Sequence, residues 1–164
     1  MPRAWKFGDD LDTDQILPGR YAPFMSGQEK FHTFAFHDAR PEFASTVRPG
    51  DVLVAGENFG CGSSREYAVA ALQKLGIAGV VARSFARIFF RNCVNLGIPA
   101  LESADAVDLL EDGDEVTLDL AAGRLKTPRG VATLRPLPAF AREILAAGGV
   151  VAYLRSRGDL PSVG

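Results

Sequence analysis

The sequence that decides the fold is Val52-Leu53-Val54-Ala55, followed four residues later by Gly60-Cys61-Gly62-Ser63-Ser64-Arg65-Glu66. The first stretch has the length and the unbroken apolar character of a buried strand. The second predicts a glycine-rich loop that opens a helix over about 64–75, which Gly76 ends. A strand that leads through glycines into a helix is typical of a parallel sheet, and ligands of such sheets gather at the carboxyl ends of the strands.

The chain after this helix repeats the alternation. An apolar run over 77–82 predicts a second strand, and 98–101 predicts a third. Between them we expect a helix over about 85–96, with Ser84 as its N-cap and Gly97 at its end. The order strand, helix, strand, helix, strand predicts a parallel sheet with helices on its faces.

The last third of the chain has a different pattern. Polar and apolar residues alternate over 115–120 and 125–127 around Gly123, which predicts antiparallel strands. A final helix is expected over about 138–147, and 150–154 is either a strand or a short continuation of it. The expected fold class is therefore α/β, with a mixed, partly parallel sheet, flanking helices and a small antiparallel part.

The segment 5–41 is predicted to be rich in loops, because Gly, Asp and Pro interrupt it repeatedly. Its many aromatic residues indicate that it is ordered. Long loops in compact domains are usually functional or disordered.

Composition bounds the classes of function. The 164 residues are 47% hydrophobic and 23% charged, which suits one globular domain over 1–164. The net charge is −2 and the basic residues are scattered, so we expect no nucleic-acid partner and no anionic membrane partner. No run is long enough for a membrane span and no signal-peptide pattern follows the first residues, so we expect a cytoplasmic protein.

The two cysteines, Cys61 and Cys93, are too few for a disulfide framework. They are also too few for an iron–sulfur cluster held by this chain alone, which usually takes three or four thiolates. We therefore expect no metal site here. Cys61 is either a reactive thiol near a helix N-terminus or, as we prefer, a small residue that fills a tight turn.

Ser63, Ser64 and Arg65 fall at the first turn of the predicted helix. Unpaired backbone N–H groups and a partial positive charge at this point would bind an anion, and Arg65 would add a planar fork for a carboxylate or phosphate. Ser63 with Glu66 also fits a capping box. Capping does not explain the whole group, so an anion site with a base or nucleophile in it stays open beside the cap.

Two further groups have both a chemical and a structural interpretation. Asp12-Thr13-Asp14 could bind a substrate or the region of Arg65, although an Asx-type turn is the preferred interpretation. His32 and His37 are the only histidines, and a serine hydrolase with Ser63 as its nucleophile would need one of them. Their aromatic neighbours favour packing in an ordered loop.

The sequence resembles the aconitase superfamily, and within it the small subunits of 3-isopropylmalate dehydratase and homoaconitase. Three motifs occur in the order and spacing of that family, and the resemblance covers nearly the whole chain. They are Asp12-Thr13-Asp14-Gln15-Ile16 with Pro18, the glycine loop 60–66, and Arg83-Ser84-Phe85-Ala86-Arg87-Ile88-Phe89-Phe90-Arg91-Asn92.

The resemblance implies a swivel-type domain that works with a separate large subunit. That subunit would hold a [4Fe–4S] cluster on three cysteines and leave one iron open to the substrate. By the same resemblance Ser63 is the catalytic base, Arg65 binds a substrate carboxylate and Ser64 lies beside it. The supporting residues would be Asp12, Thr13, Asp14, Gly60 and Gly62.

The segment 19–25 corresponds to the loop that recognises the variable end of the substrate in this family. The candidate substrate-binding residues here are Arg20, Tyr21, Ala22, Pro23 and Phe24. Their mostly apolar character favours the isopropyl group of isopropylmalate, in leucine biosynthesis. Arg20 would instead suit the third carboxylate of homoaconitate, in lysine biosynthesis. An independent serine hydrolase and an anion-binding module without chemistry are the alternatives from other classes.

Overall fold

Four parallel strands form the central sheet in the order β1-β2-β3-β4. In the computed structural model, which describes residues 2–22, 30–62 and 66–158, the two central strands are apolar and buried along their whole length, and the two outer strands are buried in part. Their bounds are Ala4–Lys6 for β1, Val52–Ala55 for β2, Gly79–Ala82 for β3 and Ala100–Glu102 for β4. The predicted α/β class is confirmed.

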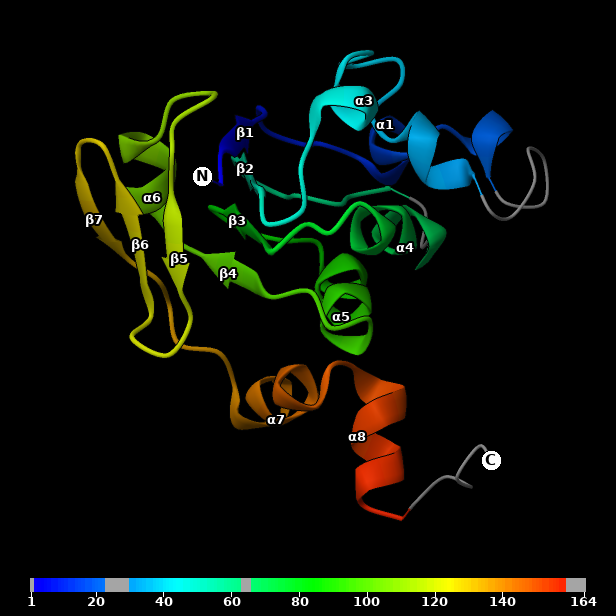
Figure 1. The fold of residues 1–164 in the computed structure, drawn as a ribbon, viewed down its shortest axis with the longest axis vertical. Coiled ribbons are helices and arrows are strands. Elements are labelled where there is room, and N and C mark those ends of the chain that lie inside the picture. Colours follow the sequence, from blue (N-terminus) through cyan, green and yellow to red (C-terminus); the bar gives the residue numbers. More distant parts are fainter. Residues whose placement is uncertain (1, 23–29, 63–65, 159–164) are drawn as a thin grey trace.

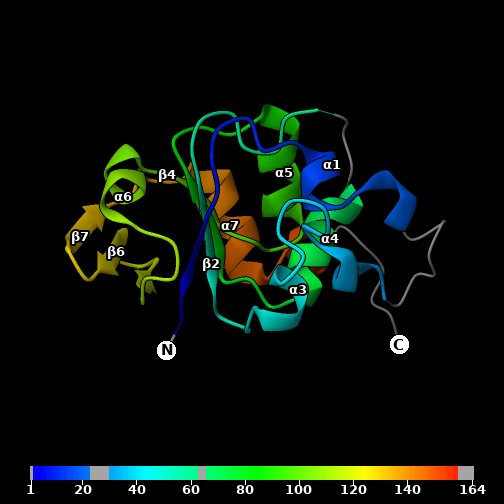
Figure 2. The ribbon, with the colours of Figure 1, turned by 90° about the horizontal axis from the view of Figure 1, so that it is seen from above.

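Helices α4 (Glu66–Lys74) and α5 (Arg87–Asn95) connect β2 to β3 and β3 to β4. Because the strand order follows the chain order, right-handed crossovers place both helices on the same face of the sheet. Figures 1 and 2 show α4 and α5 together on one side. The other face is covered by α6 (Ala104–Leu109) and a second sheet, so the expected flanking helices and small antiparallel part are both present.

This second sheet is antiparallel, as expected, and separate from the first. Its order is β5-β6-β7, with bounds Thr117–Asp119, Arg124–Thr127 and Gly130–Thr133. Helix α6 (Ala104–Leu109) packs with it, and Ser103 caps α6 by accepting a bond from the N–H of Ala106 at 3.1 Å. Figure 2 shows this layer opposite α4 and α5.

Residues of the parallel strands alternate between two apolar cores. Leu53 and Val80 face the core shared with α4 and α5, whereas Val54 and Val81 face the core shared with α6 and the antiparallel sheet. All four are fully buried. This alternation follows from the two-residue period of a strand, and it explains why the strands read as unbroken apolar runs.

The loop-rich segment folds into short helices against the first core. These are α1 (Thr13–Ile16), the 3-10 helices η1 (Gly19–Tyr21) and η2 (Phe31–Phe34), and α3 (Phe43–Thr46). Phe36 and Phe43 are fully buried, and their rings meet edge to face at 4.8 Å. The order expected from the aromatic residues is therefore found in the described part of this segment.

One local expectation was wrong, and one of two alternatives left open for another segment is excluded. Ser84 does not cap α5, which begins at Arg87 after Ala86 and has no side-chain cap. The segment 150–154 is not a strand. It belongs to a separate helix, α8 (Val150–Ser156), which follows α7 (Ala139–Ala147).

The turn between α7 and α8 depends on glycines with left-handed backbone, because Gly148 has φ 93° and Gly149 has φ 133°. This turn lies against the end of α5, where a Cβ on Gly97 would come within 2.5 Å of the Gly148 carbonyl oxygen. Among the described helices, none is long and apolar enough to cross a membrane.

Candidate active site

Three loops meet at the carboxyl edge of the parallel sheet. They follow β1, β2 and β3 and contain the three motifs singled out in the sequence. Because these strands are neighbours and parallel, their carboxyl ends must lie side by side. The glycine loop is the middle one, between the Asp12 loop and the loop of Phe85.

Backbone bonds join the Asp12 loop to the glycine loop. The N–H of Gly60 donates to the carbonyl of Leu11 at 2.7 Å, and the N–H of Thr13 donates to the carbonyl of Cys61 at 2.9 Å. Asp12 and Cys61 also form a parallel bridge. Two segments that lie about fifty residues apart in the chain are thus fixed in register.

The loop after β3 is joined to the glycine loop in the same way. The N–H of Phe59 donates to the carbonyl of Ser84 at 3.0 Å, and the N–H of Ala86 donates to the carbonyl of Phe59 at 2.9 Å. The Ser84 hydroxyl accepts a bond from the Asn58 N–H at 2.7 Å and donates to Glu57 at 2.8 Å. Ser84 therefore fastens the loop instead of capping α5.

Gly60 shows why this loop needs glycine. Its φ is +83°, and a Cβ built on it would lie 2.0 Å from Cγ of Phe89 in α5. Gly62 has φ +95°, and a Cβ there would make only ordinary contacts, at 3.4 Å from Cβ of Asp12. Gly60 thus allows the loop to lie directly on α5, whereas Gly62 allows only the backbone turn.

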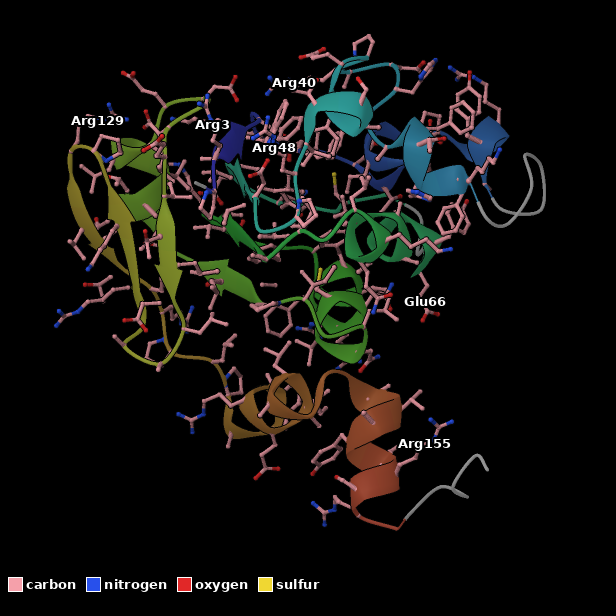
Figure 3. The ribbon with its side chains drawn as sticks, viewed as in Figure 1. Arg3, Arg40, Arg48, Glu66, Arg129 and Arg155 are labelled. Carbon is pink, nitrogen blue, oxygen red and sulfur yellow. The ribbon has the colours of Figure 1, made fainter. Side chains whose placement is uncertain are left out.

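The residues proposed for the chemistry come next in the chain. Ser63, Ser64 and Arg65 lie outside the described residues, as do Pro23 and Phe24. The described residues on either side of 63–65 are Gly62 in the loop and Glu66, the first residue of α4 (Figure 3). The helix is nine residues long, so its first turn carries the partial positive charge expected of a helix N-terminus.

The acidic motif has structural bonds. Asp12 caps α1 by accepting from the Gln15 N–H at 2.8 Å, and the Gln15 side chain accepts from the Asp12 N–H at 2.9 Å. This arrangement is a capping box. Asp14 accepts from the N–H of Gly19 at 2.9 Å, which connects α1 to η1. The described contacts of both carboxylates fit the structural interpretation, and Thr13 is buried between the loops.

Two neighbours restrain the Arg20 side chain, which is nevertheless exposed. It forms an ion pair with Asp38, and its guanidinium carbon lies 4.6 Å from the centre of the Tyr21 ring. The hydrogen bond to Asp38 raises the pKa of Arg20, and the same bond lowers the pKa of Asp38. Tyr21 in turn stacks on Phe34 with ring centres 4.1 Å apart.

Ala22 does not offer the surface that its place in the substrate loop suggested, because it is fully buried. Among the described candidates, Arg20 and Tyr21 remain as recognition residues. They belong to η1, which Asp14 connects to the Asp12 loop and so to the carboxyl edge of the sheet.

Both histidines take part in aromatic packing. The ring of His37 lies edge-on to Tyr21 at 5.0 Å and to Phe34 at 5.7 Å. His32 lies edge-on to Phe31 at 6.3 Å. These contacts agree with the preferred interpretation of the histidines as part of an ordered loop.

The surroundings of Cys61 keep its thiol protonated. Burial raises the pKa of this thiol first, and the negative charges of Asp12 and Asp10 raise it further. A reactive cysteine needs the opposite environment, so the alternative of a small turn residue is favoured. Cys93 is buried in the core, and burial raises its pKa as well.

Sequence reasoning missed the residues that fasten the loops. Asp10 and Asn58 both adopt positive φ, at 53° and 58°, and the Asn58 amide donates to the Asp10 carboxylate at 3.2 Å. Asp and Asn tolerate this backbone better than other residues. Their presence beside glycines was the available signal. Asp38, the partner of Arg20, gave no such signal.

Comparison with known proteins adds the family. The Aconitase C-terminal domain matches residues 13–106. The chain is 58% identical to the 3-isopropylmalate dehydratase small subunit 1 of Deinococcus radiodurans, over 98% of this chain and 90% of that protein. It is 56% identical to the homoaconitase small subunit of Thermus thermophilus, over 98% of this chain and 99% of that protein.

A solved structure agrees with these sequences. The crystal structure of a 3-isopropylmalate dehydratase from Methanocaldococcus jannaschii superimposes with a TM-score of 0.87 at 42% identity, covering 96% of this chain and 93% of that one. The resemblance seen in the three motifs is therefore confirmed over nearly the full length. This chain belongs to the family of the aconitase C-terminal domain.

Proposed function

We propose that this chain is the small subunit of a hydro-lyase that interconverts 2-isopropylmalate and 3-isopropylmalate by dehydration and rehydration. The observation that carries the proposal is the 58% identity with a dehydratase small subunit along 98% of the chain. The convergence of the three family motifs at one edge of the sheet supports it. Residues 1–164 would act as one swivel-type domain.

The chain would work with a large subunit. The relatives are named as small subunits, and the family resemblance implies that a [4Fe–4S] cluster would be held by the large one. The donors present here do not fit such a cluster, because only two cysteines exist and Cys93 is buried in the core. When bound to its own subunit, the cluster would supply a Lewis acid for the departing hydroxyl.

The task of this chain would be to remove a proton next to a substrate carboxylate. Such a proton is weakly acidic, so negative charge that develops on the substrate must be stabilised. Ser63 would take the proton and Arg65 would bind the carboxylate, with Ser64 beside it. The N-terminus of α4 would favour the negative charge on the Ser63 oxygen and on the substrate.

The described loops would position these groups. Gly60 rests against Phe89, and the backbone on both sides of it is bonded to the neighbouring loops. Rotation or displacement of the loop would break several of these bonds at once. The loop therefore provides the rigid support that a catalytic group needs.

Replacement of Ser63 tests the proposal. In the enzyme reconstituted with its large subunit, Ser63→Ala should reduce kcat at least about 100-fold, the lower end of the contribution of a general base. Its free energy of unfolding should fall by only about 0.5–2 kcal/mol, the range for a lost helix cap. Ser45→Ala is the matched control, since the exposed Ser45 hydroxyl donates to the nearby Glu42 carbonyl and lies outside the candidate site.

A Ser63→Ala enzyme with near-normal turnover and a lower melting temperature would make Ser63 a cap and nothing more.

Arg65→Lys gives a second check. It should raise KM, because a point charge cannot form the paired bonds of a guanidinium with a carboxylate.

Homoaconitate is the second candidate substrate. The observation that favours it is the 56% identity with a homoaconitase small subunit over 98% of this chain. The two activities differ in the group at the variable end of the substrate, so Arg20 and its partner Asp38 would separate them.

A further inference from the structure

A pocket lies at the end of the parallel sheet opposite the candidate active site. It occupies about 390 Å³ where β1 and β2 begin, and its walls include Arg3, Trp5, Arg40, Thr46, Arg48 and Asp51. This volume lies within the range of about 300–1,000 Å³ typical of small-molecule pockets. Figure 3 shows the three arginines around the start of β1 and next to α3.

The wall of this pocket is built around one buried carboxylate. Asp51 is only 4% exposed and accepts three bonds, each of 3.0 Å, from the N–H of Arg3, the N–H of Arg48 and Nε1 of Trp5. Buried carboxylates need such bonds to offset lost hydration. As a result the backbones of Arg3 and Arg48 are both fixed by the Asp51 carboxylate.

The third arginine is already neutralised. Arg40 makes two bonds with Asp112, at 2.8 and 3.1 Å, and one with Glu42 at 3.2 Å. Its guanidinium carbon also lies 4.7 Å from the centre of the Trp5 ring. Arg40 therefore forms a fixed wall and has little capacity left for another anion.

Arg3 and Arg48 differ from Arg40. Their guanidinium groups are exposed, and among the residues that the structure describes neither forms an ion pair. Their backbones are bonded instead: both amides donate to the Asp51 carboxylate, the Arg3 carbonyl accepts from the Val52 N–H, and the Arg48 carbonyl accepts from the Asp51 N–H. Two uncompensated guanidiniums at one pocket present the planar donors that phosphates and carboxylates prefer.

We propose that this pocket binds a small organic anion through the guanidiniums of Arg3 and Arg48. Its anionic head would be a phosphate or a carboxylate, and the exposed hydroxyl of Thr46 would be a further donor. The lining contains three arginines and two aspartates, a net charge of +1, and Glu42, which also bonds Arg40, brings the whole cluster to about zero. This favours a compact anion over a highly charged polymer. The site is separate from the residues of the proposed reaction.

The structure offers a direct test, because Trp5 is the only tryptophan of the chain and lines the pocket. Inorganic phosphate and malonate would be titrated into the full chain at constant ionic strength. Calorimetry should give saturable binding of one equivalent for at least one of them, and Trp5 fluorescence should change with the same midpoint. The tighter of the two identifies the head group as phosphate or carboxylate.

The variant R3Q/R48Q removes both guanidiniums and keeps the backbone amides that Asp51 needs. We expect it to fold and to lose at least about tenfold in affinity, since hydrogen bonds from a charged guanidinium to an anion are among the strongest in proteins. Arg155→Gln is the matched control, because Arg155 is an exposed arginine on α8, far from this pocket in Figure 3. Its affinity should be unchanged.

Several results would overturn the proposal. The absence of saturable binding by either anion would do so. Binding that persists in R3Q/R48Q, or that leaves Trp5 fluorescence unchanged, would belong to another surface such as the candidate active site. None of these results bears on turnover, so the proposed function would stand or fall separately.

Discussion

Cys61 lies inside the candidate site without the surroundings of a reactive thiol. Burial and the carboxylates of Asp12 and Asp10 raise its pKa, so the thiolate is scarce at neutral pH. Native-state alkylation by iodoacetamide should therefore be slower than that of free cysteine at pH 7.5, and should accelerate only as the pH rises through the raised pKa. Because Cys93 is buried, the reaction reports on Cys61 alone.

Asp12→Asn should increase this alkylation rate at fixed pH, since it removes one negative charge and keeps a residue able to cap α1. Asp105→Asn, on the exposed side of α6, is the control and should have no effect. An alkylation rate equal to or above that of free cysteine would show an activated thiol and contradict this account. Cys61→Ala should retain turnover in the reconstituted enzyme.

A second prediction at the residue scale concerns the choice of substrate, which we expect Arg20 to influence. Its guanidinium is paired with Asp38 and lies over Tyr21, so a third substrate carboxylate would have to compete with Asp38. We expect the wild-type enzyme to prefer isopropylmalate in kcat/KM. Asp38→Asn should free Arg20 and raise kcat/KM for homoaconitate by a few-fold, with little change for isopropylmalate.

Arg20→Ala should remove that gain in the Asp38→Asn background. The opposite result is a wild-type preference for homoaconitate that disappears in Arg20→Ala alone. It would assign the chain to the second candidate substrate and leave the roles proposed for Ser63 and Arg65 intact.

At the scale of elements, the contact between the glycine loop and α5 is the critical one. Gly60 and Gly113 have nearly the same φ, +83° and +85°, but only Gly60 faces an obstacle, Phe89. Gly113→Ala should cost about 1–2 kcal/mol from left-handed backbone alone. Gly60→Ala should cost about 1–3 kcal/mol more, because the loop or Phe89 must move.

Urea denaturation of both variants measures this difference, and kcat of the reconstituted enzyme shows whether the loop has shifted. Equal losses of stability would mean that Phe89 moves aside without cost. The glycine would then serve the backbone turn only.

The elements that could be predicted share one property. β2, α4, β3, α5 and β4 follow from apolar runs and glycine stops in the local sequence, and the structure contains all five. β1, α6 and β7 have three to six residues, and they were not predicted. Such short elements depend on tertiary pairing, as in the register of Trp5 with Leu53, which no local pattern reveals.

The same limit applied to the site. Glycines and the paired aspartates could be recognised from the sequence, since they have few alternatives in tight turns. The fastening of the loops by Ser84 with Glu57 joins residues 27 positions apart. Ser84 looked like a cap because its local sequence suits one, but the neighbouring loop provides a competing acceptor.

On the scale of the whole molecule, the layers leave the carboxyl edge of the parallel sheet for the candidate site. The antiparallel sheet covers one face, α4 and α5 cover the other, and α7 and α8 lie against the end of α5 (Figure 1). The loops at this edge are bonded to one another, but the chain has too few thiolates for a cluster beside them. These facts favour a composite site, of which this chain provides one half and a second subunit would provide the other.

This arrangement predicts how the chain behaves alone and with its partner. The purified chain should be colourless and should not convert isopropylmalate, whereas addition of the cluster-loaded large subunit should produce turnover that saturates with the amount of this chain. The Ser63→Ala chain provides the sharper test. Because the replacement should leave the fold and docking surface intact, an excess should displace the wild-type chain and reduce turnover in proportion to its share. A brown isolated chain that dehydrates substrate would overturn the prediction, and an excess of Ser63→Ala without effect would show that this residue is needed for assembly.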